Sequence, residues 1–227
     1  MVKKRTAAFF AALSILFLSS CSLIGAEKTD YSSESVIGSA LSDAAVVNEL
    51  TNIIGALSAD SPYLTEFSGT LDAVAKFSDT LLSHMLKTNY SRFSGNTEVL
   101  KKAAKEYPHL NISVAIGASD FEGALYTYFN HGGNIRHGDT AVFRYLTKIK
   151  AYVPMISLSS SVPALEIVSI DETKSTYRMT FYVSLDGELS PAYLATFVKR
   201  ENKDCYILSL KKVASEKVSY NIPELFS

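Results

Sequence analysis

Residues 177–185, YRMTFYVSL, decide the class of fold. Apolar side chains occupy every second position of this segment. Because successive side chains of a β-strand point to opposite faces of a sheet, this period of two predicts a strand with one buried face. The alternating members are Tyr177, Met179, Phe181, Val183 and Leu185.

Three further segments around this strand have strand-like sequences and are separated by short polar turns. Asp186-Gly187, directly after the first strand, is a typical tight-turn pair. Four strands joined by short turns predict an antiparallel meander, one face of which helices can cover. The three further segments are residues 165–170, 193–199 and 205–213.

Residues 141–155, AVFRYLTKIKAYVPM, fit two kinds of structure. Spacings of three and four between Val142, Leu146 and Ile149 would suit a helix. The density of β-branched and aromatic residues around Thr147-Lys148 favours a β-hairpin instead. We predict the hairpin.

Two long segments ahead of these strands have the apolar period of amphipathic helices. The first runs from Ser33 to Ser58, and the second extends to Met85 from Pro62, a residue that suits the first turn of a helix. Because the loop between them is short, we predict an antiparallel helical hairpin within residues 33–96.

The remainder, residues 97–227, is predicted to be an α+β domain with an antiparallel sheet. A shorter helix is expected over 97–107, a strand over 112–116 and another helix over 119–130. The fold class is therefore α+β, with an N-terminal helical hairpin followed by helices packed on a β-meander.

Both ends of the helix over 119–130 have sequence signals. Ser119 and Glu122 have the S-x-x-E spacing of a capping box at its start. Gly132 and Gly133 follow its end, where a residue with positive φ is commonly needed. We expect these two glycines to supply that conformation.

The first 21 residues have the features of a secretory leader. Lys3, Lys4 and Arg5 precede a 12-residue apolar run, too short for the roughly 20 residues of a spanning helix. Leu18-Ser19-Ser20-Cys21 resembles the lipobox of bacterial lipoproteins, which implies cleavage before Cys21 and acylation of its thiol. On this resemblance, residues 1–20 are a signal peptide and residues 21–32 a tether.

The resemblance places the mature chain on the extracytoplasmic face of a bacterial membrane, anchored by lipid. Without the leader, the chain has 19 basic and 23 acidic residues, and no basic stripe. Nucleic acid is therefore excluded as an expected partner. Residues 21–90 contain three lysines and nine acidic residues, which could form an acidic surface for a basic partner, but we favour a solvated helix face.

His131, His137 and Asp139 form the best candidate for a chemical site. Two imidazoles and a carboxylate in a glycine-rich loop could hold zinc, but their spacing matches no zinc motif. Ser209-Leu210-Lys211-Lys212 matches S-x-x-K, yet it lies on an expected strand and its partner motifs are missing. We predict no catalytic residue, no metal and no cofactor, and expect the loop from His131 to Asp139 to be structural.

Cys205 is the second cysteine of the chain, and Cys21 is predicted to bear lipid. Cys205 begins an apolar run and has no neighbouring histidine or basic cluster, so we predict a buried free thiol. A dyad with His84 or His109 would need a proximity that the sequence does not supply.

The segment from Ser119 through Tyr128-Phe129 and Tyr152-Val153-Pro154 to the final meander is loosely similar to the C-terminal domains of uncharacterised lipoproteins of Gram-positive anaerobes. This resemblance implies location and fold, but no chemistry. We therefore predict a non-enzymatic binding or assembly module, with the membrane and an envelope protein as partners. The alternative is an envelope hydrolase that uses His131, His137 and Asp139. A solute-binding lipoprotein fits poorly, because alternating βα units are absent from the pattern.

Overall fold

The computed structural model describes residues 31–58, 61–133, 135–157, 163–201 and 204–213. The predicted leader, Cys21 and most of the predicted tether lie outside these residues. Tertiary contacts divide the chain into two units, residues 1–33 and 34–227, and the elements below belong to the second. Within the described residues, no helix has the length and apolar character needed to cross a membrane.

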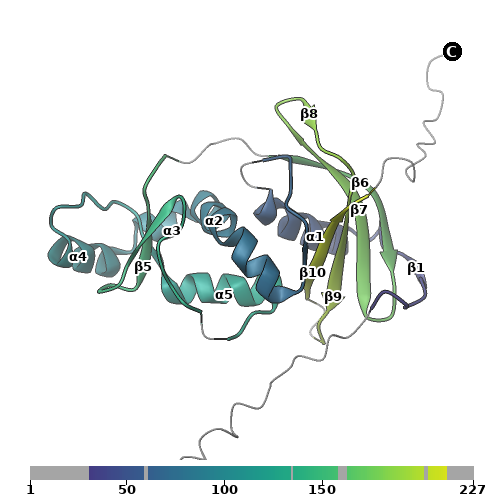
Figure 1. Ribbon diagram of the computed structural model, residues 1–227, viewed down its shortest axis with the longest axis horizontal. Helices are drawn as coiled ribbons and strands as arrows, with labels where there is room; N and C mark the ends of the chain where they lie inside the picture. Colours follow the sequence, from purple (N-terminus) through teal and green to yellow (C-terminus); the bar gives the residue numbers. More distant parts are fainter. Residues whose placement is uncertain (1–30, 59–60, 134, 158–162, 202–203, 214–227) are drawn as a thin grey trace, which may run out of the picture. The chain divides into compact units, whose positions relative to one another are not determined.

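A large antiparallel sheet forms the C-terminal half of this unit (Figure 1). Its four long strands are neighbours in the order in which they occur in the chain, which confirms the predicted α+β class and the succession of antiparallel strands. The long strands are β6 (Ala164–Glu172), β7 (Thr176–Leu185), β9 (Tyr193–Lys199) and β10 (Cys205–Lys212).

Three two-residue strands extend this sheet at its margins. Two of them come from the segment predicted to be helical, so residues 33–96 and the C-terminal strands share one sheet. They are β1 (Gly38–Ser39) beside β6, β2 (Phe67–Ser68) beside β10, and β8 (Glu188–Leu189) beside β7.

The alternation in β7 gives the large sheet its buried face. Met179, Phe181 and Val183 are fully buried, and the register places Phe181 opposite Tyr193 on β9. Removing such side chains from water is the main favourable contribution to folding. Figure 1 shows that helices cover this face of the sheet. They are α1 (Ala44–Leu57), α2 (Thr70–Thr88) and α5 (Ala118–Phe129).

Helix α1 is shorter than the helix predicted over residues 33–58. It begins at Ala44 because the Asp43 carboxylate accepts hydrogen bonds from the amides of Ala45 and Val46, at 3.0 and 3.3 Å. The residues before it were wrongly predicted as helix, since they contain β1, which pairs with β6. Ahead of β1, the Glu34 carboxylate accepts from the Thr173 hydroxyl at 2.6 Å in the β6–β7 turn.

The capping box predicted at Ser119 and Glu122 does not form. Helix α5 begins after Gly117 without a side-chain cap, and the Glu122 carboxylate bonds to His137 instead. The expectation for the other end is also wrong. Asn130 takes the left-handed conformation there, at φ 55°, while Gly132 and Gly133 do not have positive φ. Asn tolerates this conformation because its short polar side chain can bond locally.

Arg200, in the turn between β9 and β10, joins the large sheet to the end of α5. Its guanidinium donates to the Tyr126 carbonyl at 2.6 Å, where the last carbonyls of a helix lack partners within the helix. The same group lies over the rings of Tyr126 and Tyr206, at 5.0 and 5.1 Å from their centroids. Arg200 therefore fixes where α5 ends relative to the sheet.

A second, three-stranded sheet lies apart from the first and confirms the hairpin predicted over residues 141–155. Its β4 and β5 are antiparallel neighbours joined by residues 147–150, and β3 pairs with the other side of β5. Buried side chains on one face of this sheet and on α4 form a small separate core, whereas Ile116, Phe143 and Tyr152 belong to the main core. These elements are β3 (Ile116–Gly117), β4 (Phe143–Leu146), β5 (Ala151–Pro154) and α4 (Thr97–Glu106), and α3 (Tyr90–Ser94) precedes α4.

The strand predicted over 112–116 is reduced to two residues, and Pro154 explains why. Ile116 lies opposite Tyr152 on β5, so Val114 would come opposite Pro154 if the ladder continued. The backbone groups of successive residues on β5 point alternately toward β3 and toward β4. The Ala118 amide donates to the Lys150 carbonyl on the β3 side, and the Met155 amide donates to the Val142 carbonyl, next to β4. Position 154 therefore faces β3, where proline has no N–H to donate.

Candidate functional site

The three residues of the predicted loop site are held by different parts of the structure. The His131 amide bonds to the Leu125 carbonyl at the end of α5, at 3.3 Å. The Asp139 carboxylate accepts from the Tyr145 amide at 2.8 Å, and His137 points to Glu122 and Tyr152. Among the described residues, no group of three or more His, Cys, Asp or Glu side chains is placed to hold a metal ion.

His137 is the centre of a chain of hydrogen bonds that runs from the exposed Glu122 to the buried Tyr152. Its Nε2 lies 2.8 Å from the Glu122 carboxylate and its Nδ1 lies 3.0 Å from the Tyr152 hydroxyl. Because an ionised carboxylate only accepts, Nε2 carries the proton, and neutral Nδ1 then accepts from Tyr152. The Tyr145 ring stacks on the imidazole, with centroids 5.0 Å apart and planes inclined by 17°.

This chain supports the structure and leaves little room for chemistry. The His137 side chain is 14% exposed and Tyr152 is buried, so a reacting molecule has poor access to either. Burial, followed by the neighbouring Tyr145, raises the pKa of Tyr152 to about 12. The Tyr152 hydroxyl thus stays protonated and acts as a hydrogen-bond donor to His137.

Cys205 is a buried free thiol, as predicted. Burial raises the pKa of the thiol, and the carboxylate of Glu49 raises it further. The same carboxylate accepts the backbone amide of Cys205 at 2.6 Å. Because the thiolate is the reactive form of cysteine, these surroundings make Cys205 inert.

Neither histidine considered as a partner of Cys205 has such a role. His84 packs edge-on against Tyr128, and His109 packs against Tyr107, with ring centroids 6.2 and 6.4 Å apart. Ser209 of the S-x-x-K match lies within β10, between Thr196 on β9 and Ser68 on β2. That position in a sheet differs from the helix start that the motif requires.

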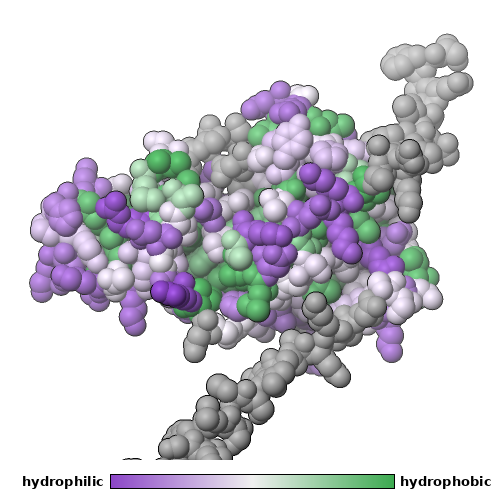
Figure 2. Space-filling model, viewed as in Figure 1, coloured by the Kyte–Doolittle hydropathy of each residue, from purple (hydrophilic) through white to green (hydrophobic). Residues whose placement is uncertain are grey.

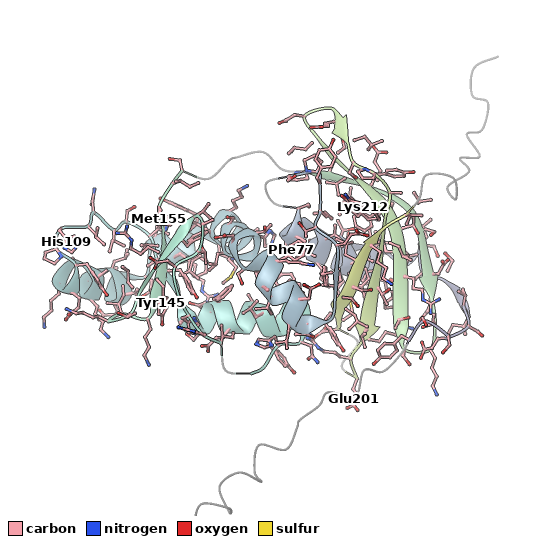
Figure 3. All side chains as sticks on the ribbon, in the orientation of Figure 1. Phe77, His109, Tyr145, Met155, Glu201 and Lys212 are labelled. Atoms are coloured by element: carbon pink, nitrogen blue, oxygen red, sulfur yellow. The ribbon has the colours of Figure 1, made fainter. Side chains whose placement is uncertain are left out.

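A shallow groove opens where β3 ends, and it is a candidate for a binding site. Its volume is about 280 Å³. One wall is the irregular segment before β3, and the other is the end of the β4–β5 hairpin; Figure 3 labels Met155 at that end. The lining residues are Leu110, Asn111, Ile112, Ser113, Val114, Arg144, Val153, Pro154 and Met155.

Arg144 gives this groove a positive charge. It lies opposite Val153 in the β4–β5 register, so both side chains are on the face of the sheet that carries the small core with α4. Its side chain is exposed and has no hydrogen bond or ion pair among the described residues. The exposed side chains of Asn111 and Ser113 likewise have no recorded partner within the described ranges.

The surroundings of the groove are basic, unlike the acidic N-terminal segment. Residues 97–115 and 143–156 contain six basic and two acidic side chains. Both acidic groups are paired, Glu98 with Lys101 and Glu106 with Lys148. Figure 2 shows the hydrophilic side chains over α4, next to this sheet. An anion approaching the groove is therefore attracted.

The sequence patterns point to the loop from His131 to Asp139 and miss the groove. The sequence contained one indication of the groove, Pro154, because a proline at the end of a strand removes one hydrogen-bond donor from the ladder. Its consequence could be recognised only once β3 was known to lie beside Pro154. Comparisons of the chain with models of protein families, with curated proteins and with solved structures found no match.

Proposed function

We propose that this protein is a lipid-anchored, non-enzymatic binding module of the extracytoplasmic face of a bacterial membrane, and that the groove beside Pro154 is its binding site. The second half of this proposal rests on Arg144, which lines the groove together with polar and apolar side chains and has no ion pair among the described residues. The predicted leader and the Leu18 to Cys21 motif support the lipid-anchored, extracytoplasmic location.

The anchor would hold the folded unit close to the bilayer. Two long acyl chains on Cys21, each CH₂ contributing about 0.8 kcal/mol, would make attachment stable. A tether of about ten residues reaches at most roughly 35 Å when fully extended. It would lead to Glu34, whose carboxylate is bonded to Thr173 in the β6–β7 turn. We also propose that α1 and α2 act as the antiparallel hairpin expected from the sequence and support the sheet.

The anchor is tested by Cys21→Ser in the full chain, followed by membrane fractionation and mass analysis of the mature N-terminus. We expect the variant to be released or to keep its leader, because serine has no thiol to acylate. Cys205→Ser is the matched control, since it removes the other cysteine and should stay in the membrane fraction. Normal processing and unchanged membrane retention of Cys21→Ser would refute the anchor.

The binding partner on this proposal is an envelope protein or peptide that reaches the same face of the membrane. Soluble protein comprising residues 22–227 contains the entire folded unit of residues 34–227 and can be used without the anchor. Immobilised through its N-terminus, it should retain an envelope component that Arg144→Gln does not retain. Equal retention by both proteins would exclude the groove as the binding site.

A further inference from the structure

We propose that the groove beside Pro154 binds the C-terminal end of an extended peptide, with the terminal carboxylate on Arg144. The inference takes from the proposed function only that this groove is the binding site, and it does not depend on the anchor. Three features of the groove support it: an interrupted strand ladder, a guanidinium without a partner among the described residues, and apolar side chains in a groove of limited size.

The interrupted ladder offers backbone groups that a peptide could use. Val114 is the residue that would pair with β5 if position 154 had an N–H. Its amide and carbonyl have no hydrogen-bond partner among the described residues. A peptide end lying in the groove could exchange backbone hydrogen bonds with these unpaired groups, the kind of contact that holds an extended peptide at the margin of a sheet.

The unpaired guanidinium offers a fixed partner for a carboxylate. Arg144 is anchored on a strand and has a planar, permanently charged head group that matches a carboxylate through two parallel hydrogen bonds. The basic character of the surrounding segments adds to this preference for an anion, since Lys102, Lys105 and Lys150 also lack an ion pair within the described residues.

The size and polarity of the groove limit what can occupy it. A volume of about 280 Å³ lies just below the usual range for ligand sites, roughly 300–1,000 Å³, so only a small ligand or a short terminal stretch fits. Leu110, Ile112 and Met155 provide apolar contacts for a side chain. A phosphate or sulfate ion would use Arg144 but leave these apolar residues in water.

The experiment uses ¹⁵N-labelled protein of residues 22–227 and a set of N-acetyl tripeptides that end in alanine, valine, leucine or phenylalanine. Each peptide is titrated as the free acid and as the C-terminal amide, and inorganic phosphate is titrated separately. Amide chemical shifts report both the affinity and the location of binding. Arg144→Gln removes the proposed carboxylate partner, and Arg136→Gln, at an exposed arginine outside the groove, is the matched control.

We expect at least one free acid to shift the amides of Ser113, Val114 and Arg144 with a Kd of about 1 mM or tighter. The corresponding amide and the Arg144→Gln variant should bind at least about tenfold more weakly, the loss of one charge-assisted pair. Arg136→Gln should bind like the unaltered protein.

Three results would overturn the inference: no shift in the groove with any free acid, equal binding of acid and amide, or equal shifts with phosphate. The last result would identify a general anion site. None of these results bears on the anchor, because the labelled protein lacks Cys21. Conversely, if membrane attachment proved independent of Cys21, the conclusion drawn from the peptide titration would still hold.

Discussion

The two sheets of this protein are both antiparallel, but they differ in how completely their strands are paired. In the large sheet, β7 and β9 have neighbours along most of their length, and their inner side chains are fully buried. In the small sheet, pairing of β3 ends at Ile116, opposite Tyr152. The complete ladder provides stability, whereas the interrupted one leaves backbone and Arg144 available for a ligand.

The largest difference should appear when a matched pair of core phenylalanines is truncated. Phe181 on β7 and Phe143 on β4 are both fully buried. We expect Phe181→Ala to lower the free energy of unfolding by about 5 kcal/mol and Phe143→Ala by about 3 kcal/mol, the two ends of the usual range. Both rings lie in the main core, so the expected difference comes from the strands that carry them: β4 is short and paired on one side, and it can shift toward a cavity more easily than β7, which is paired on both sides.

Urea denaturation of both variants measures this difference. Equal losses in the free energy of unfolding for Phe143→Ala and Phe181→Ala would contradict the expected difference between the two sheets. Hydrogen exchange adds a second criterion, because the exchange increase in Phe143→Ala should be concentrated in residues 143–154.

The connection between the large sheet and α5 should have the next largest effect. Arg200→Ala removes the guanidinium that bonds the Tyr126 carbonyl and packs between two tyrosine rings. We expect a loss of about 1–3 kcal/mol, the usual effect of removing a charged hydrogen-bond donor. The exposed Arg136→Ala should change stability by less than about 0.5 kcal/mol. Similar losses in both variants, measured by thermal unfolding, would contradict the proposed role of Arg200.

In the small sheet, Tyr152 should make stability depend on pH. Tyr152→Phe removes the donor to His137 and should cost about 1 kcal/mol at pH 7. The pKa of Tyr152 is raised to about 12 in the folded state, above the ordinary value of 10.0. The unfolded chain therefore loses this proton first as the pH rises, and the unaltered protein loses about 1.4 kcal/mol per pH unit from this group above pH 10.

Phenylalanine cannot ionise, so the stability deficit of Tyr152→Phe should shrink above pH 10 and disappear near pH 11. The other tyrosines are common to both proteins and cancel in the difference. Urea midpoints at pH 7, 9, 10 and 11 measure this trend. A deficit that stays constant to pH 11 would show that Tyr152 ionises alike in the folded and unfolded chains.

The smallest effect on stability is expected from Pro154→Thr, which gives β5 the missing N–H. The new amide should donate to the Val114 carbonyl and lengthen β3, changing stability by about 1 kcal/mol or less. Its exchange with solvent should be slow, and the groove should bind the tripeptides more weakly because Val114 is then occupied. A fast-exchanging amide at position 154 would refute proline as the reason why β3 ends.

Sequence periodicity determined the parts of this fold whose pattern is local. Alternation in residues 177–185 predicted β7, and the turn pair Asp186-Gly187 lies where β7 ends. The helix over 119–130 also follows from spacing within one segment, and the hairpin of residues 141–155 follows from its density of β-branched and aromatic residues, although its spacing would also have suited a helix. The Leu18 to Cys21 motif is equally local, and the lipid anchor that it predicts stays a prediction.

Only the tertiary structure decided the candidate site and the contacts between elements. The groove depends on Val114 meeting Pro154, and the hydrogen-bond chain depends on Glu122 and Tyr152 lying on either side of His137. Arg200 bonds to the end of α5, 74 residues earlier in the chain. Periodicity reports which face of an element is buried, but it does not report which partner that face meets. The capping box at Ser119 failed for this reason: tertiary structure gave Glu122 a partner, His137, that its own segment could not reveal.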